Sequence, residues 1–143
     1  MKTFRVGLVG CGGIAQVHGA VLQELPGVEL VTCADIRPER AQAFGKTFGA
    51  KPYASLEEML EGETLDCLHI CTPHYLHTPM AQLAASRGIH VFTEKPPVMN
   101  REQWTQFQAL EQAPVRVGVC FQNRYNASVH LLQEVLASGE AGK

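Results

Sequence analysis

The sequence lacks an excess of charge of either sign. Its 143 residues include 12 lysines and arginines and 14 aspartates and glutamates, so the formal net charge is −2. A nucleic acid or an anionic membrane attracts proteins that carry a strong positive charge. We therefore expect neither among the partners of this chain. Hydrophobic residues make up 45% and charged residues 18%, as in one globular domain rather than a disordered chain.

Long uninterrupted apolar runs are also absent. Residues 6–23 and 67–86 carry no formal charge, but glycines and a histidine break the first stretch, and prolines and histidines break the second. A membrane-spanning helix needs about 20 predominantly apolar residues. Arg5 and the glycines likewise interrupt any apolar core of a secretion signal. Neither a membrane span nor a signal peptide is expected.

The five cysteines contain no C-x-x-C pair. Cys67, His69 and Cys71 alternate along an apolar run, so they share one strand face and raise the question of a metal site. No fourth ligand has a suitable spacing, which favours buried free thiols and a packed histidine. We expect no metal, and free thiols indicate a reducing, cytoplasmic setting.

The chain alternates between strand and helix patterns. Apolar runs typical of strands occupy residues 4–10, 28–35, 51–53, 65–72, 89–94 and 115–121, and helical patterns occupy residues 13–24, 37–49, 56–61, 76–87, 101–112 and 127–138. Strands that alternate with helices pair in parallel through right-handed crossovers. The sequence therefore predicts an α/β fold with a doubly wound parallel sheet (a Rossmann fold) and the strand order 3-2-1-4-5-6.

Glycines gather where the first strand gives way to the first helix. Gly10, Gly12 and Ala15 form G-x-G-x-x-A. Gly13 and Ile14 lie between the last two of these, at the start of the predicted helix. In this pattern the first glycine permits a tight turn, the second lets the backbone approach a pyrophosphate, and the small third residue packs helix on strand. The N–H groups at the start of the helix would then hold the phosphates.

An acidic residue ends the second strand. Asp35 lies 25 residues after Gly10 (35 − 10 = 25), close to the roughly 20 residues typical of the acid that binds an adenosine ribose. Such an acid repels a 2′-phosphate, which favours NAD over NADP. Arg37 is placed to reach a 2′-phosphate, so NADP stays the alternative. Asp35 could also be a helix cap ahead of Pro38.

Three further motifs follow later strands. They are "CTPHYLH" at residues 71–77, "HVFTEKP" at residues 90–96 and "NRY" at residues 123–125. With the glycine motif, they give the whole chain a resemblance to the Gfo/Idh/MocA family, named after glucose–fructose oxidoreductase and inositol dehydrogenase. The resemblance implies a nicotinamide-dependent oxidoreductase that acts on a hydroxyl or carbonyl, usually of a sugar or polyol.

The resemblance also implies roles for individual residues. Thr72 and Pro73 match residues that lie along the cofactor, and His77 matches a histidine near the nicotinamide. A histidine satisfied by its neighbours is the alternative for His77. Asn123 and Arg124 match residues near the nicotinamide, with a helix cap and a surface charge as their alternatives.

The most specific motif is E-K-P. Glu94 and Lys95 match the family's residues at the cofactor, where the lysine meets the substrate hydroxyl and is catalytic. A cation beside that oxygen stabilises alkoxide character. Because Pro96 and Pro97 follow, either preceding peptide bond is a candidate for the cis form.

The resemblance further predicts a domain division. Residues 1–125 form the NAD(P)-binding domain, and residues 126–143 begin the connection to an α+β substrate domain that this chain lacks. We expect nucleotide binding with little or no turnover, and the exposed domain surface leaves a homo-oligomer open. Two alternatives remain: a non-catalytic NAD(H) sensor or interaction module, and a Rossmann-like domain for another adenosine ligand such as S-adenosylmethionine.

Overall fold

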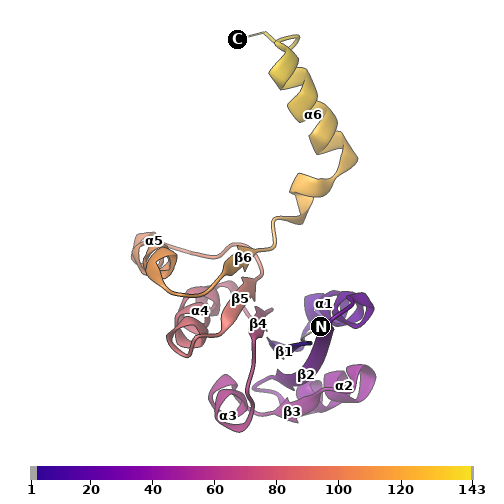
Figure 1. The fold of residues 1–143 in the computed structure, drawn as a ribbon, viewed down its shortest axis with the longest axis vertical. Helices are drawn as coiled ribbons and strands as arrows, with labels where there is room; N and C mark the ends of the chain where they lie inside the picture. The colour runs from indigo at the N-terminus through magenta and orange to yellow at the C-terminus, as the bar shows by residue number, and fades with distance from the viewer. Residues whose placement is uncertain (1–2, 143) are drawn as a thin grey trace.

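The computed structural model describes residues 3–142 as a six-stranded parallel sheet with the order β3-β2-β1-β4-β5-β6 (Figure 1). This confirms the predicted doubly wound topology. The strands are β1 (Phe4–Val9), β2 (Val28–Ala34), β3 (Lys51–Tyr53), β4 (Cys67–Ile70), β5 (His90–Thr93) and β6 (Val117–Val119). The helices are α1 (Gly13–Glu24), α2 (Pro38–Phe48), α3 (Leu56–Gly62), α4 (His77–Ser86), α5 (Arg101–Gln108) and α6 (Ala127–Ser138).

Local residue chemistry explains several element boundaries. The Ser55 hydroxyl accepts a hydrogen bond from the Glu58 N–H at the start of α3, as a capping serine should. Gly49 ends α2 with φ +71°, a left-handed conformation that a side chain disfavours. Pro38 opens α2, where its missing N–H costs no hydrogen bond.

Three short 3₁₀ segments depart from the predicted pattern. They are η1 (His74–Leu76), η2 (Ala109–Gln112) and η3 (Gln122–Tyr125). The first precedes α4 and overlaps the predicted helix 76–87 only at Leu76, whereas the second follows α5 inside the helix predicted over residues 101–112. Tightened turns of this kind are common at helix ends because they satisfy backbone groups left without α-helical partners.

Helices cover the two faces of the sheet unequally. In Figure 1, α1 and α2 lie on one side, and α3, α4 and α5 lie on the other. Leu8 and Phe44 are fully buried in the core beneath α1 and α2, and Leu68 and Met59 are fully buried in the opposite core. Burying each such side chain contributes about 2 kcal/mol to stability. Both cores fix the strand ends from which the site loops emerge.

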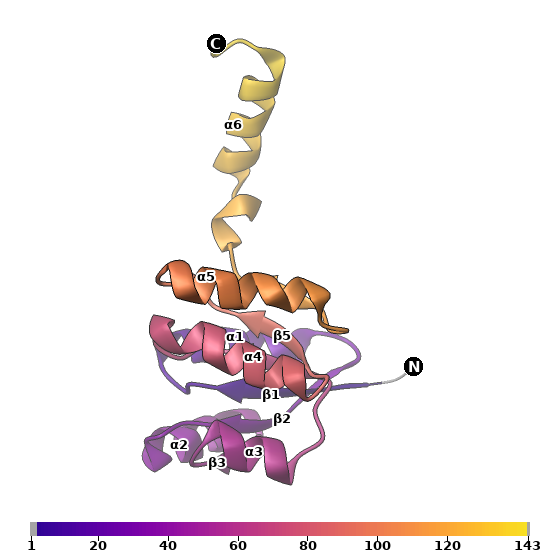
Figure 2. The same cartoon turned by 90° about the vertical axis from the view of Figure 1, so that its left-hand side faces the viewer.

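The last helix stands apart from the sheet. Figures 1 and 2 show α6 extending away from the layers. Its apolar side chains Leu131, Leu132 and Leu136 are all more than half exposed. No helix within residues 3–142 is both long and apolar enough to cross a membrane.

Candidate functional site

The predicted motifs meet at the carboxyl edge of the sheet, in the loops that follow β1, β2, β4, β5 and β6. The turn after β1 depends on Gly10, which has φ +88°. A Cβ atom there would lie 2.7 Å from the backbone of Cys71 and Thr72. Both the conformation and the space therefore require glycine, because the β1 and β4 loops touch at this point.

At Gly12 and Gly13, neither the backbone conformation nor the packing requires glycine. A Cβ atom at either position would meet nothing within 4 Å, and neither residue has a positive φ. Packing within the protein thus gives no reason for glycine here. Gly12 is the N-cap of α1 and offers no side-chain cap to the helix N–H groups. The open space in front of those donors is what a close-approaching anion needs.

The two residues that follow differ in exposure. Ala15 is fully buried against the sheet, as expected for the small third residue of the motif, and Ile14 is 43% exposed beside the turn. The glycine turn therefore combines a packed side with an open side.

Asp35 ties the loop after β2 to the glycine turn. One carboxylate oxygen accepts the Cys11 N–H at 2.8 Å, and the other accepts the Arg37 N–H at 2.8 Å. The N-cap of α2 is Arg37, so Asp35 is not the cap of that helix. Asp35 is 9% exposed as a residue, and each carboxylate oxygen retains a second acceptor position.

A surface hollow of about 230 Å³ lies beside Asp35, bounded by loops from β1, β2 and β4. Arg37 and Arg40 contribute cations to its lining, and Thr72 and Pro73 contribute the β4 loop. Ile36, which the sequence reading overlooked, also lines it and is 87% exposed. An apolar side chain this exposed beside a hollow suits contact with a flat ligand ring.

His77 is fully buried, and its ring bridges two loops. Nδ1 lies 2.8 Å from the Pro96 carbonyl oxygen and Nε2 lies 2.8 Å from the Thr72 carbonyl oxygen. Because carbonyl oxygens only accept, the ring nitrogen that carries the proton donates to the carbonyl that it faces. This is the alternative in which neighbours satisfy the histidine. Both ring nitrogens face protein carbonyl oxygens, so His77 links the β4 and β5 loops in this structure.

The predicted catalytic lysine lies at the surface after β5. Lys95 is exposed, and it lines a hollow of about 560 Å³ together with Asn123 and Arg124. The structure thus brings together the residues of two motifs that lie 28 positions apart (123 − 95 = 28). The Lys95–Pro96 peptide bond is cis, one of the two bonds that the sequence marked as candidates.

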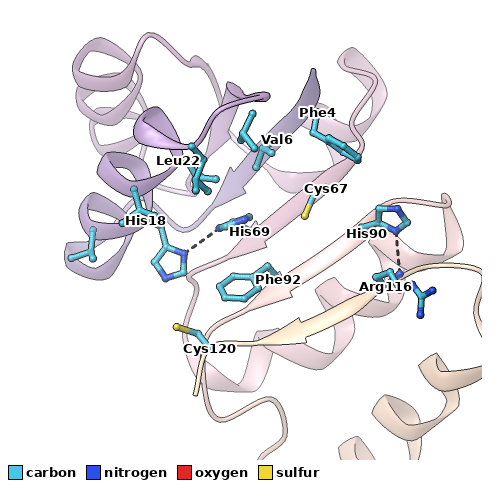
Figure 3. A pocket seen from close by; sticks show the side chains of 14 residues that line it. Phe4, Val6, His18, Leu22, Cys67, His69, His90, Phe92, Arg116 and Cys120 are labelled. Carbon is cyan, nitrogen blue, oxygen red and sulfur yellow. Dashed lines mark hydrogen bonds between the residues drawn. The ribbon is translucent and has the colours of Figure 1, made fainter. Parts of the chain in front are cut away.

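Glu94 points away from that surface and toward α1, where it forms a cluster with His18 and His69. One of its oxygens lies 3.0 Å from His18 Nε2, and the other accepts the Lys95 N–H at 3.1 Å. His18 Nδ1 in turn lies 3.2 Å from His69 Nδ1 on β4. Figure 3 shows His18 reaching from its helix toward His69, with Phe92 and Cys120 nearby.

The sequence reading missed His18, although a signal was present. Ala15, His18 and Leu22 share one face of α1 at helical spacing, and all three are buried. A buried histidine needs hydrogen-bond partners. His69 was considered with Cys67 and Cys71 as a metal site, but its hydrogen-bond partner is His18. His18, Glu94 and Cys120 lie close enough to suggest metal ligands, yet the 3.0 Å contact between the first two is an ordinary hydrogen bond.

Burial sets the charges in this cluster. Burial and the neighbouring His18 lower the pKa of His69 from 6.5 to about 4, so His69 is neutral at neutral pH. Burial raises the pKa of Glu94, but hydrogen bonds from His18 and from the Lys95 N–H outweigh it and leave the pKa below the usual 4.5. Glu94 is therefore a carboxylate whose charge is stabilised by hydrogen bonds, among them those from His18 and the Lys95 N–H.

The thiols nearest the site are protonated at neutral pH. Burial raises the pKa of Cys67 to about 11 and also raises the pKa of Cys71. Burial and the Glu94 carboxylate raise the pKa of Cys120. Since the thiolate is the nucleophile, these cysteines have structural environments rather than reactive ones.

The cluster borders an apolar hollow of about 550 Å³ on the α1 side of the sheet, over β4, β5 and β6 (Figure 3). His18, His69 and Cys120 line one end, and His90 and Arg116 line the other. No helix in the described part of the chain covers these strands on that side, in contrast to the face under α3, α4 and α5 (Figure 1).

Known proteins share both the sequence pattern and this architecture. The chain is 30% identical to glucose-6-phosphate 3-dehydrogenase of Bacillus subtilis over 139 residues, which cover 96% of this chain and 39% of the relative. It is 26% identical to myo-inositol 2-dehydrogenase of Thermotoga maritima over 141 residues, covering 97% and 42%.

A solved structure is similar as well. The WlbA dehydrogenase from Bordetella pertussis, crystallised in complex with NADH and UDP-GlcNAcA, has a TM-score of 0.92 and 37% identity, with 99% of this chain and 44% of that chain covered. The chain thus spans about two fifths of the length of these relatives.

The pattern of an oxidoreductase family with an NAD-binding Rossmann fold matches residues 4–121, which include the glycine turn, the β4 loop and the E-K-P motif. That match covers most of the chain, and the topology agrees with it. This protein therefore belongs to the Gfo/Idh/MocA family of NAD-binding oxidoreductases.

Proposed function

We propose that this chain is the nucleotide-binding domain of an NAD-dependent oxidoreductase that acts on a hydroxyl or carbonyl of a sugar or polyol. One observation carries the proposal: Gly12 and Gly13 leave open space in front of the α1 N-terminus without any packing need for glycine. The relatives support the substrate class, since they include dehydrogenases of a sugar phosphate and of an inositol.

The glycine turn and Asp35 would hold the nucleotide half of NAD. The α1 N–H groups bind the pyrophosphate, because a helix N-terminus combines free donors with a favourable dipole. Asp35 accepts from the adenosine ribose with the acceptor positions left over from its two backbone bonds. Ile36 packs on the adenine, and Thr72 and Pro73 form the opposite wall of the same hollow.

Lys95 would lie at the nicotinamide end of the cofactor, beside the substrate. When bound, the nicotinamide supplies the hydride acceptor or donor. The Lys95 ammonium stabilises the negative charge that develops on the substrate oxygen. Asn123 and Arg124, which share its hollow, contact the nicotinamide half or the substrate. Glu94 does not contact the substrate; its carboxylate accepts the Lys95 N–H and so holds the backbone that carries the lysine.

Residues 126–143 would lead from this domain toward a second one that completes the substrate pocket. The exposed leucines of α6 and the coverage of about two fifths of the relatives support this division. We expect the 143-residue chain by itself to bind nucleotide and to turn over little or no substrate.

Calorimetric titration of the chain with NADH, and separately with NADPH, tests the proposal. We expect saturable NADH binding that weakens about tenfold or more in Asp35→Ala, the loss of a charge-assisted ribose contact. Arg37→Ala is the matched control, since it should leave NADH affinity within about twofold and weaken any NADPH binding. Tighter NADPH binding that depends on Arg37 would reverse the choice of cofactor. A folded chain that binds neither would contradict the proposal.

A further inference from the structure

His18 and Glu94 connect two elements that serve opposite ends of the proposed cofactor site. His18 lies on α1, whose first residue is Gly13. Glu94 follows β5 and directly precedes Lys95. Their 3.0 Å contact is buried, with the two side chains 7% and 9% exposed. A buried contact between a histidine and a carboxylate is stronger than one in water, because the local dielectric is low.

The Glu94 carboxylate uses both of its oxygens. Oε1 faces His18 Nε2, and Oε2 accepts the Lys95 N–H at 3.1 Å. If the carboxylate turned away from His18, the second bond would lose its geometry as well. The orientation of the peptide that carries Lys95 therefore depends on a side chain from α1.

His69 orients the imidazole of His18. The two Nδ1 atoms lie 3.2 Å apart, so one donates and the other accepts. His18 Nε2 faces a carboxylate oxygen, which only accepts, so that nitrogen carries a proton. The ring of His69 also packs against Phe92, with centroids 4.9 Å apart, which fixes it on the sheet.

We propose that His18 is a positioning residue for Lys95: it donates from Nε2 to Glu94, and Glu94 in turn holds the Lys95 backbone. The catalytic meaning of this contact rests on the proposed role of Lys95, whereas the contact itself does not. By this route α1, at whose start the pyrophosphate would bind, also fixes the loop of the lysine that would meet the substrate.

Amide hydrogen exchange of the nucleotide-free chain, read by NMR at Lys95, tests the proposal. In His18→Ala we expect the Lys95 N–H to exchange about tenfold faster, the effect of losing one hydrogen bond of roughly 1.4 kcal/mol. In His18→Gln the rate should return to within about twofold of the original, since the glutamine amide donates from the place of Nε2. His18→Asn has a donor that is too short and should not restore it.

His130→Ala on exposed α6 is the control and should leave the Lys95 N–H unchanged. A rate in His18→Ala equal to that of the original chain would overturn the proposal, as would equal rates in the glutamine and asparagine variants. If His18→Ala does not fold, the glutamine and asparagine pair decides the question alone. A chain that shows this pattern but binds no NADH would refute the proposed function and leave the positioning contact standing.

Discussion

At the carboxyl edge of the sheet, the loops after β1 and β2 are held by more contacts between their own residues than the loops after β5 and β6. At β1 and β2, Gly10 packs against the β4 loop, and Asp35 accepts two backbone hydrogen bonds. At β5 and β6, Lys95, Asn123 and Arg124 are exposed around a wide hollow. The first half is organised before a ligand arrives. The second half presents the side chains of its candidate site residues to solvent, while Glu94 and His77 hold the backbone around Lys95 and Pro96.

This difference indicates where stability and function coincide. In the β1–β2 half, Asp35 would contact the nucleotide and also holds two loop N–H groups, so its substitution should cost both stability and affinity. In the β5–β6 half, the exposed residues should be removable with little effect on folding. Four predictions test that contrast, in order of decreasing effect.

Gly10→Ala should have the largest effect, a loss of about 3 kcal/mol of unfolding free energy, because a left-handed conformation and a backbone clash add together. The Cβ atom would lie 2.7 Å from the Thr72 nitrogen. Denaturant unfolding followed by circular dichroism measures the loss. Gly27→Ala is a useful comparison, since Gly27 also has a positive φ but open space around it. Equal losses at the two positions would show that the clash contributes nothing.

Asp35→Asn should cost about 2 kcal/mol, since an amide keeps one acceptor where the carboxylate used two. The Cys11 and Arg37 N–H groups would then compete for a single oxygen. The same unfolding measurement applies, with Arg37→Ala as a neighbouring substitution that keeps both bonds. A variant as stable as the original chain would show that Asp35 does not organise the turn.

Acid should destabilise the chain through His69 on β4, which contacts the His18–Glu94 pair behind Lys95 and whose pKa is lowered to about 4 from 6.5. The unfolded chain binds the proton first as pH falls, so the stabilisation is complete above pH 6.5 and is lost progressively toward pH 4. We expect about 1.5 kcal/mol less unfolding free energy at pH 5 than at pH 7, after allowance for partial solvent contact.

Unfolding curves at both pH values, compared with His69→Gln, isolate this contribution. The variant should lose clearly less stability between the two values. An identical pH dependence would assign the acid sensitivity to other groups. The lowered pKa of Glu94 adds a further loss only below about pH 4.5.

Lys95→Ala should have the smallest effect on folding, less than about 0.5 kcal/mol, because the side chain is exposed. NADH affinity should also change little, within about threefold, if Lys95 acts on substrate more than on cofactor. Calorimetry and denaturant unfolding together check both expectations. A large loss of stability would show that the lysine is structural. It would contradict the expectation that exposed residues of the β5–β6 half contribute little to folding.

Much of the fold follows from local sequence signals. Alternating strand and helix patterns predicted the strand order, and Ser55, Pro38 and Gly49 act at the boundaries where their chemistry placed them. Short strands and 3₁₀ ends were harder to predict, because tertiary hydrogen bonds decide where the last turn tightens. The strand β4, for example, has four residues, fewer than the run at residues 65–72 predicted.

The candidate site was predictable where a motif is contiguous and less so where it depends on distant contacts. The glycine turn could be located from the spacing of its residues, and the E-K-P loop from the resemblance to the family. The His18–Glu94 contact joins residues 76 positions apart, and no local pattern specifies it. His77 shows the same limit, since its two carbonyl partners come from separate loops. The orientation of α6 likewise could not be read from its amphipathic sequence.

The most direct test of the account is a paired measurement on Gly12→Ala: its unfolding free energy and its affinity for NADH. Because a Cβ atom at this position meets nothing within 4 Å, stability should fall by no more than about 0.5 kcal/mol or rise slightly. NADH affinity should fall about tenfold or more, since the methyl group occupies the space that the pyrophosphate needs. A Gly12→Ala variant that is as stable as the original chain and binds NADH equally well would contradict the claim that this open space is the nucleotide site.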